Sequence, residues 1–107
     1  MTHELFALHA DICKTLANPK RLEIIYALKD GEKSAGELTL ALGIPKANAS
    51  QHLAVLRVCG VVKARRDGVN IYYSISSPKI VAACALMREV LHEQMEAKRS
   101  VLKQIRK

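Results

Sequence analysis

The sequence has little of what marks the commonest enzyme and cofactor sites. Its 107 residues include no tryptophan, one phenylalanine and three cysteines. Three scattered cysteines are too few for a disulfide framework. There is no GxGxxG, P-loop, HExxH or paired CxxC motif, and no serine, histidine and acid with the spacing of a nucleophile and its base. These absences argue against an enzyme and against a structural zinc site.

Long apolar runs are missing as well. The longest runs from Ile80 to Met87, eight residues, whereas a membrane span needs about 20. No basic head precedes an apolar stretch at the N-terminus, so we expect no secretory signal, no membrane partner and a cytoplasmic location. The length predicts one domain over residues 1–107 with a modest core.

Acidic residues are missing from one stretch of an otherwise mixed chain. Seventeen Lys and Arg oppose ten Asp and Glu, for a net charge of +7. Residues 46–66 hold no acid, and their basic residues are Lys46, Arg57, Lys63, Arg65 and Arg66. A basic block inside a folded segment favours a polyanion partner, and a merely solvated basic surface is the alternative.

Apolar residues three or four apart predict a helix over about residues 3–17. Asn18 followed by Pro19 is typical of a helix start, and Asp30-Gly31 of a helix end, so a second helix lies between them. The inward residues are predicted to be Leu5, Leu8, Ile12 and Leu16 in the first helix, and Leu22, Ile25 and Leu28 in the second.

The middle of the chain predicts a helix-turn-helix over about residues 34–58. Ser34 and Glu37 have the spacing of a capping box, and Gly43 is a typical end for the short helix that follows. The next helix spans about residues 46–58, with Ala49, Leu53 and Leu56 inward. Its opposite face is small or polar and carries no acid, as a helix that enters the major groove requires.

A change to a period of two predicts a hairpin wing over residues 61–75, turning at Asp67-Gly68. The register that separates apolar from polar residues pairs Arg66 with Val69. It places Ala64 opposite Ile71 and Val62 opposite Tyr73 on one face, and Lys63 opposite Tyr72 and Arg65 opposite Asn70 on the other. A helix-turn-helix followed by a basic hairpin is a winged helix.

Ser77-Pro78 begins a last helix that runs to about residue 105. About 28 residues of helix span about 42 Å, more than a domain of this size covers. Its apolar stripe therefore predicts a homodimer through residues 3–17 and 78–105; a frayed basic tail beyond Lys98 is the alternative. The predicted interface comprises Leu5, Leu8, Ile12, Cys84, Met87, Leu91 and Met95. The fold class is mainly α with a wing, in the order α-α-α-α-β-β-α.

The sequence resembles the ArsR family of bacterial metal- and thiol-responsive repressors. The segments that carry the resemblance are residues 16–22, 36–38, 42–44, 49–57, 66–68 and 71–73, in family order and spacing. It implies a dimeric repressor that binds a palindromic double-stranded DNA operator and leaves it when an inducer binds. With Arg57 from the acid-free stretch, the implied DNA-binding residues are Lys46, Ala47, Asn48, Ser50, Gln51, His52, Arg65, Arg66 and Asn70.

Three residues at the start of the predicted DNA-reading helix or within it differ from the others in what they can contact. Pro45 stands where the family usually has a Ser or Thr that caps the helix and can touch phosphate, and a proline side chain can do neither. Gln51 points fully outward, and its amide suits an adenine edge or a phosphate. His52 lies on the flank of the inward stripe, where a base contact and a partly buried histidine braced against the short helix before it are equal alternatives.

None of the three sensor sites of the family carries over. Where one site has Cys-x-Cys, this sequence reads Thr39-Leu40-Ala41. A second site has four metal ligands in the last helix, and three of them are missing here, where the positions hold Ser77, Lys79, Val90 and Glu93. A third site pairs two cysteines, and its positions hold Tyr26 and His92.

The remaining candidates are the three cysteines. Cys13 follows His9 by one helical turn, so the two side chains share a face. Cys13 and Cys84 suit a thiol pair, and together with His9 they suit a soft-metal site across the dimer. Cys59 follows the DNA-reading helix, where a modification would tilt it. Core packing, or a plain helix-end residue for Cys59, is the alternative. No cofactor is certain; a soft metal(loid) or a thiol-reactive inducer is the favoured effector. The other functions kept open are a repressor whose effector bypasses the cysteines and a winged-helix protein-interaction module.

Overall fold

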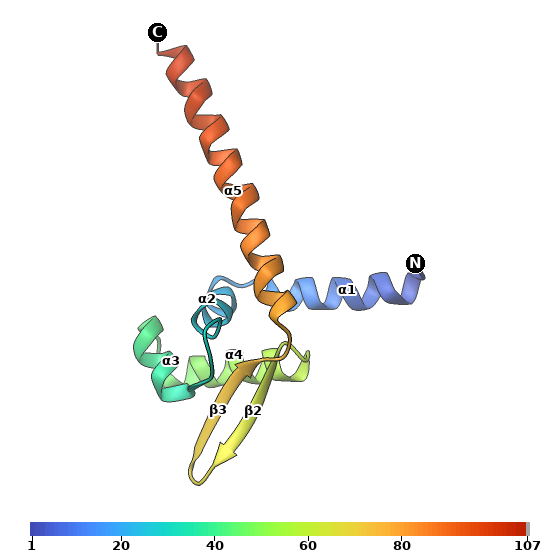
Figure 1. Ribbon diagram of the computed structural model, residues 1–107, viewed down its shortest axis with the longest axis vertical. Coiled ribbons are helices and arrows are strands. Elements are labelled where there is room, and N and C mark those ends of the chain that lie inside the picture. Colours follow the sequence, from blue (N-terminus) through green and yellow to red (C-terminus); the bar gives the residue numbers. More distant parts are fainter. Residues whose placement is uncertain (107) are drawn as a thin grey trace.

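A computed structural model describes residues 1–106, which form five helices and a three-stranded antiparallel sheet (Figure 1). The elements are α1 (His3–Leu16), α2 (Pro19–Ala27), β1 (Lys33–Ser34), α3 (Ala35–Leu42), α4 (Lys46–Val58), β2 (Val62–Asp67), β3 (Asn70–Ile75) and α5 (Pro78–Ile105). The predicted fold class, a mainly helical winged helix-turn-helix with a hairpin wing, is confirmed. The two-residue strand β1, which pairs with β3, was not predicted.

Local caps determine where α2 and α3 begin and where α3 ends. The Asn18 side chain accepts hydrogen bonds from the amides of Lys20 and Arg21 at the start of α2. Ser34 and Glu37 form the complete capping box of α3, with both hydrogen bonds at 3.1 Å. Gly43 ends α3 at a φ of 64°, a left-handed conformation that glycine adopts without strain. These contacts are local, so the sequence predicts these boundaries closely.

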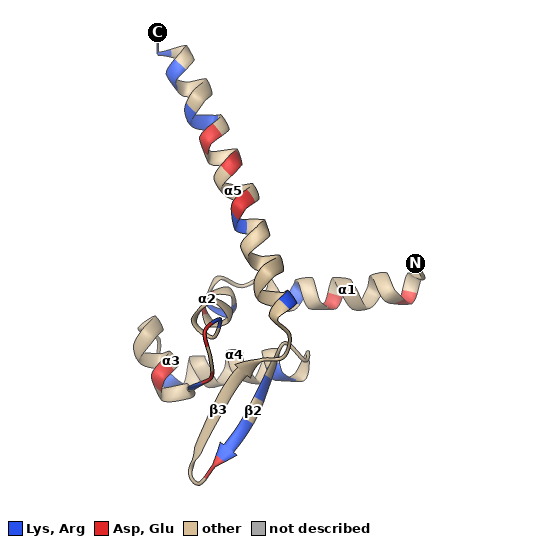
Figure 2. Cartoon of the chain, viewed as in Figure 1, with Lys and Arg blue, Asp and Glu red and all other residues tan. Residues whose placement is uncertain are grey.

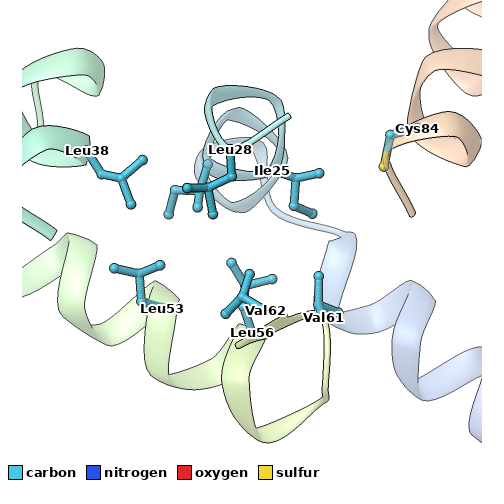
Figure 3. Packing of buried hydrophobic residues seen from close by; sticks show 9 residues of the cluster. Ile25, Leu28, Leu38, Leu53, Leu56, Val61, Val62 and Cys84 are labelled. Carbon is cyan, nitrogen blue, oxygen red and sulfur yellow. The ribbon is translucent and has the colours of Figure 1, made fainter. Parts of the chain in front are cut away.

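One apolar cluster holds α2, α3, α4 and the base of the wing together (Figure 3). Leu38 from α3 faces Leu53 from α4, and Ile25 lies above Val61, while Cys84 of α5 lies at the cluster's edge. The inward stripe of α4, Ala49, Leu53 and Leu56, is fully buried as predicted. The prediction for α2 was partly wrong: Leu22 is 37% exposed, and Ile24 is buried in the cluster.

The wing has a different register from the predicted one. Asp67 pairs with Asn70 and Ala64 with Tyr73, so each residue of β2 lies two positions further along β3. A type I′ turn at Asp67-Gly68 needs a positive φ at both residues. Of these two residues only Gly68 has a positive φ, at 62°. The two-residue loop is therefore Gly68-Val69, with glycine in its first position, and not the predicted Asp67-Gly68. A slip of two keeps every side chain on its predicted face.

The two ends of the chain project from this body in different directions (Figure 1). The first turns of α5 pack on the core through Ile80, Val81 and Cys84. The rest of α5 extends away from the wing, and α1 extends to one side. Their apolar residues are largely exposed in the single chain; Leu8 and Met87, for example, are about 60% exposed. No helix in residues 1–106 has the length and apolar character that crossing a membrane requires.

Candidate nucleic-acid interface

The outer face of α4 is exposed along its length. Because Ala49, Leu53 and Leu56 anchor the helix in the core, most of the remaining positions face solvent, while His52 and Val55 are partly buried. The exposed residues of the predicted set on this helix are Lys46, Ala47, Asn48, Ser50, Gln51 and Arg57. Pro45 begins the helix without a side-chain cap. The first-turn amides of α4 therefore lack the cap that Asn18 and Ser34 supply in α2 and α3.

His52 differs from its neighbours on α4. It is partly buried, and its Nδ1 accepts a hydrogen bond from Arg21 Nε at 3.4 Å. The alternative of a braced histidine thus has a structural basis, but the contact comes from α2 rather than from the short helix α3. Arg21 was not singled out from the sequence, because 31 residues separate it from His52.

The wing places basic residues beside α4. Figure 2 shows the basic stretch of β2, which ends in an acidic residue at the turn. Arg65 pairs with Tyr72 and Arg66 with Ile71, so the two arginines lie on opposite faces of the hairpin. Asn70, at the start of β3, is exposed. The predicted wing contacts therefore belong to two faces.

Arg65 has a carboxylate partner that the sequence did not indicate. Its Nε lies 3.2 Å from Glu32 Oε2, and its Nη2 bonds Oε1 of the same group. The guanidinium also stacks on the Tyr72 ring, 4.9 Å from the centroid. The hydrogen bond from Arg65 lowers the pKa of Glu32, and Glu32 in turn raises the pKa of Arg65. Pairing of β1 with β3 brings Glu32 to the wing, and no local pattern predicts that pairing.

Glu32→Gln is expected to strengthen DNA binding about two- to fivefold per subunit at low salt, the range of one exposed ion pair. The substitution removes the nearer of the two carboxylates beside Arg65 and leaves Asp67, whose Oδ2 is 3.9 Å from Arg65 Nη1, so the guanidinium becomes more available to a phosphate. Fluorescence anisotropy with a labelled duplex measures the change. Glu96→Gln is the matched control, because it removes a carboxylate from the exposed Glu96–Arg99 pair on α5. Equal gains in both variants would mean that only net charge matters.

The three cysteines lie in three different settings. Cys13 on α1 is exposed, Cys84 on α5 is 9% exposed, and Cys59 is the C-cap residue of α4. Cys59 Sγ lies 2.9 Å from Thr15 Oγ1, whose own hydrogen is donated to the Asp11 carbonyl. Since a hydroxyl has one hydrogen, the Cys59 thiol is the donor to Thr15. Within residues 1–106 of one chain, no three Cys, His, Asp or Glu side chains come together as a metal site.

Tyr26, at a position of the family's cysteine-pair sensor, joins α2 to α5 by a different contact. The Lys29 ammonium lies 3.6 Å from the centroid of its ring, and the Arg88 guanidinium lies at 5.2 Å. Cation–π contacts of this kind are attractive. An aromatic contact thus links the two helices at this position.

The fold and its exposed helix define the chain as a winged helix-turn-helix protein. Residues 18–64 match the model of the bacterial regulatory protein, arsR family. The HTH-type transcriptional regulator Rv0081 of Mycobacterium tuberculosis is 42% identical over 103 residues, 95% of this chain and 90% of the relative. Its crystal structure has a TM-score of 0.80 at 41% identity, covering 91% of this chain and 98% of that one.

Two further proteins extend the comparison. The transcriptional activator HlyU of Vibrio cholerae is 40% identical over 81 residues, 76% of this chain and 71% of its own. The solution structure of the homodimeric winged helix-turn-helix domain of Mb0332 from Mycobacterium bovis has a TM-score of 0.76 at 34% identity, covering 84% of this chain and 83% of that one. The chain belongs to the arsR family of bacterial regulatory proteins. It is a transcriptional regulator and not an enzyme.

Proposed function

We propose that this regulator is a homodimeric repressor that binds a palindromic operator in the cytoplasm. In each subunit α4 enters the major groove, and the wing contacts the flanking backbone. The observation that carries the proposal is the exposed, acid-free outer face of α4 with the basic strand β2 on the same side of the molecule (Figure 2). The proposed contacts are those predicted on α4 together with Arg65, Arg66 and Asn70 of the wing.

The exposed apolar faces of α1 and α5 support the homodimer. Leu5, Ile12 and Leu91 are each 42–51% exposed in the single chain. Contiguous apolar surface of this kind marks an interface in soluble proteins. A two-fold dimer buries the same face on both chains and sets its two α4 helices for half-sites about one DNA turn apart. The homodimeric Mb0332 domain has the same fold.

Gln51→Ala is expected to lower the preference for operator over random DNA by about 1–3 kcal/mol per half-site, the value of a bidentate base contact. The physical reason is the amide's paired donor and acceptor, which match an adenine edge. Binding to a duplex from the chain's own promoter and to a scrambled duplex is measured by anisotropy. Gln104→Ala on distal α5 is the control. Equal losses on both duplexes would assign Gln51 to a phosphate.

A winged-helix module that binds only proteins is the competing function. The acid-free, basic stretch of residues 46–66 argues against it, because protein partners rarely require so basic a surface. Retention on heparin that collapses with salt, followed by a shift of the promoter duplex, supports DNA binding. Failure of both measurements would favour the protein-interaction module.

Binding of the regulator to its operator is sufficient to explain repression. A dimer on its operator blocks polymerase without any additional surface. HlyU, a relative described as an activator, makes activation the second candidate. A promoter–reporter fusion distinguishes them: deletion of the regulator raises expression under repression and lowers it under activation.

For the effector, we propose a thiol-reactive species or a soft metal(loid) acting at Cys13 and Cys84, with His9 as a further ligand. Cys13 is exposed and has Lys14 beside it, a setting that favours reaction. Cys84 lies on the α5 stripe, so bridging the two would fix the angle between the dimer helices and change the spacing of the α4 helices. A repressor with an effector that bypasses the cysteines is the alternative.

Cys13→Ser and Cys84→Ser are each expected to bind operator normally and to resist release by oxidant, persulfide or arsenite. The reason is that a serine hydroxyl forms neither the disulfide nor the soft-metal bond. Operator release is followed by anisotropy, with Cys59→Ser in parallel. Induction lost only in Cys59→Ser would move the switch to the end of α4. Normal induction in all three variants would leave the cysteines with a packing role.

A further inference from the structure

Arg21 connects three helices of the regulator. Its backbone amide is bound by the Asn18 cap at the start of α2. Its Nη1 donates to the Thr15 carbonyl at 2.8 Å, and its Nε donates to His52 Nδ1 at 3.4 Å. Thr15 lies in the last turn of α1, where carbonyls have no partner within the helix. One guanidinium therefore caps α1 and holds a side chain of α4.

The hydrogen bond from Arg21 determines where the proton of neutral His52 resides. A ring nitrogen that accepts a hydrogen bond carries no hydrogen, so Nδ1 is unprotonated. In the neutral ring the single proton is then on Nε2, which becomes a donor. Nε2 is separated from Nδ1 by a single ring carbon, Cε1, and its N–H points away from the atom that Arg21 holds. His52 follows Gln51 directly on the helix proposed to enter the groove.

We infer that Arg21 is a positioning residue for DNA recognition: it holds His52 as the Nε2–H tautomer, and this N–H donates to an oxygen or nitrogen acceptor on DNA. The DNA step rests on the proposed function, whereas the tautomer is a property of the free protein. The acceptor is a phosphate oxygen or a base-edge acceptor. Uniform loss of affinity in His52→Ala identifies the phosphate, and loss confined to the operator identifies the base.

The first test needs no DNA. Ring nitrogen NMR of the ¹⁵N-labelled protein at alkaline pH should show Nε2 protonated and Nδ1 unprotonated for His52. The exposed histidines His3, His9 and His92 are internal controls, and they should show averaged tautomers. In Arg21→Ala the His52 signals should move to the averaged values, whereas Lys20→Ala should leave them unchanged. Averaged signals for His52 in the wild type would overturn the inference.

The second test uses operator DNA and a double-mutant cycle. Arg21→Ala and His52→Ala should each weaken operator binding about three- to tenfold per half-site, the effect of one hydrogen bond in each subunit. The double variant should be no weaker than His52→Ala alone, because Arg21 acts through His52. If the two losses of affinity instead multiply in the double variant, and Arg21→Ala reduces the salt slope by about 0.9 per subunit, Arg21 is a direct phosphate contact and the inference is overturned.

A third comparison stays decisive if Arg21→Ala does not fold. His52→Gln places an amide N–H near the position of Nε2, and His52→Asn places one near Nδ1. Binding retained in His52→Gln and lost in His52→Asn supports the inference, and the reverse order overturns it. If the wild type binds no DNA, the proposed function fails, while the NMR result still decides whether Arg21 sets the tautomer.

Discussion

Leu91→Glu is expected to convert the regulator to a monomer and to abolish operator binding. Leu91 is 51% exposed in the single chain and lies on the apolar stripe of α5. A two-fold interface brings two copies of the stripe together, so the substitution buries two like charges without partners, at a very high cost. A monomer contacts one half-site, which gives too few contacts for stable binding. Light scattering and operator anisotropy measure the two effects.

His92→Glu is the matched control for this prediction. It adds a negative charge at the next residue of α5, about 100° around the helix from Leu91, where the side chain is exposed. It should remain dimeric, and so should the wild type at the same concentration. A Leu91→Glu protein that is still a folded dimer would show that the interface lies elsewhere, for example on α1 alone.

Salt is expected to have the largest effect on affinity. If each subunit neutralises roughly 3–5 phosphates, the slope of log affinity against log salt is about −5 to −9. Between 50 and 200 mM salt, operator affinity should then fall about 10³- to 10⁵-fold. Displaced counterions are the physical cause. A salt-independent affinity would rule out the electrostatic part of the proposed interface.

The two wing arginines should contribute unequally to this slope. In the described residues Arg66 takes part in no ion pair, whereas Arg65 bonds Glu32. Arg66→Ala should therefore flatten the slope by nearly two per dimer, about 0.9 per subunit, and Arg65→Ala by less. Lys98→Ala on distal α5 should leave the slope unchanged. In the Glu32→Gln protein the effect of Arg65→Ala should come closer to that of Arg66→Ala, with Asp67 still 3.9 Å from Arg65.

The two wing arginines differ in a way that no local pattern in the sequence indicates. Alternation along β2 correctly separated the faces of the hairpin, because side chains alternate with a period of two in any register. It could not detect Glu32, which reaches Arg65 only because β1 pairs with β3. The register itself slipped by two, since both pairings separate apolar from polar residues and only the backbone at Gly68 distinguishes them.

The winged-helix architecture and the limits of α3, α4 and α5 follow from local patterns in the chain. Caps such as the Ser34–Glu37 box act over three or four residues, and the burial of Leu53 follows from helical periodicity alone. Three contacts arise only when the chain folds: Arg21 with His52, Cys59 with Thr15, and Arg65 with Glu32. Each of these contacts joins residues more than thirty positions apart. Such contacts depend on how helices pack, and packing leaves no periodic or local signal in the chain.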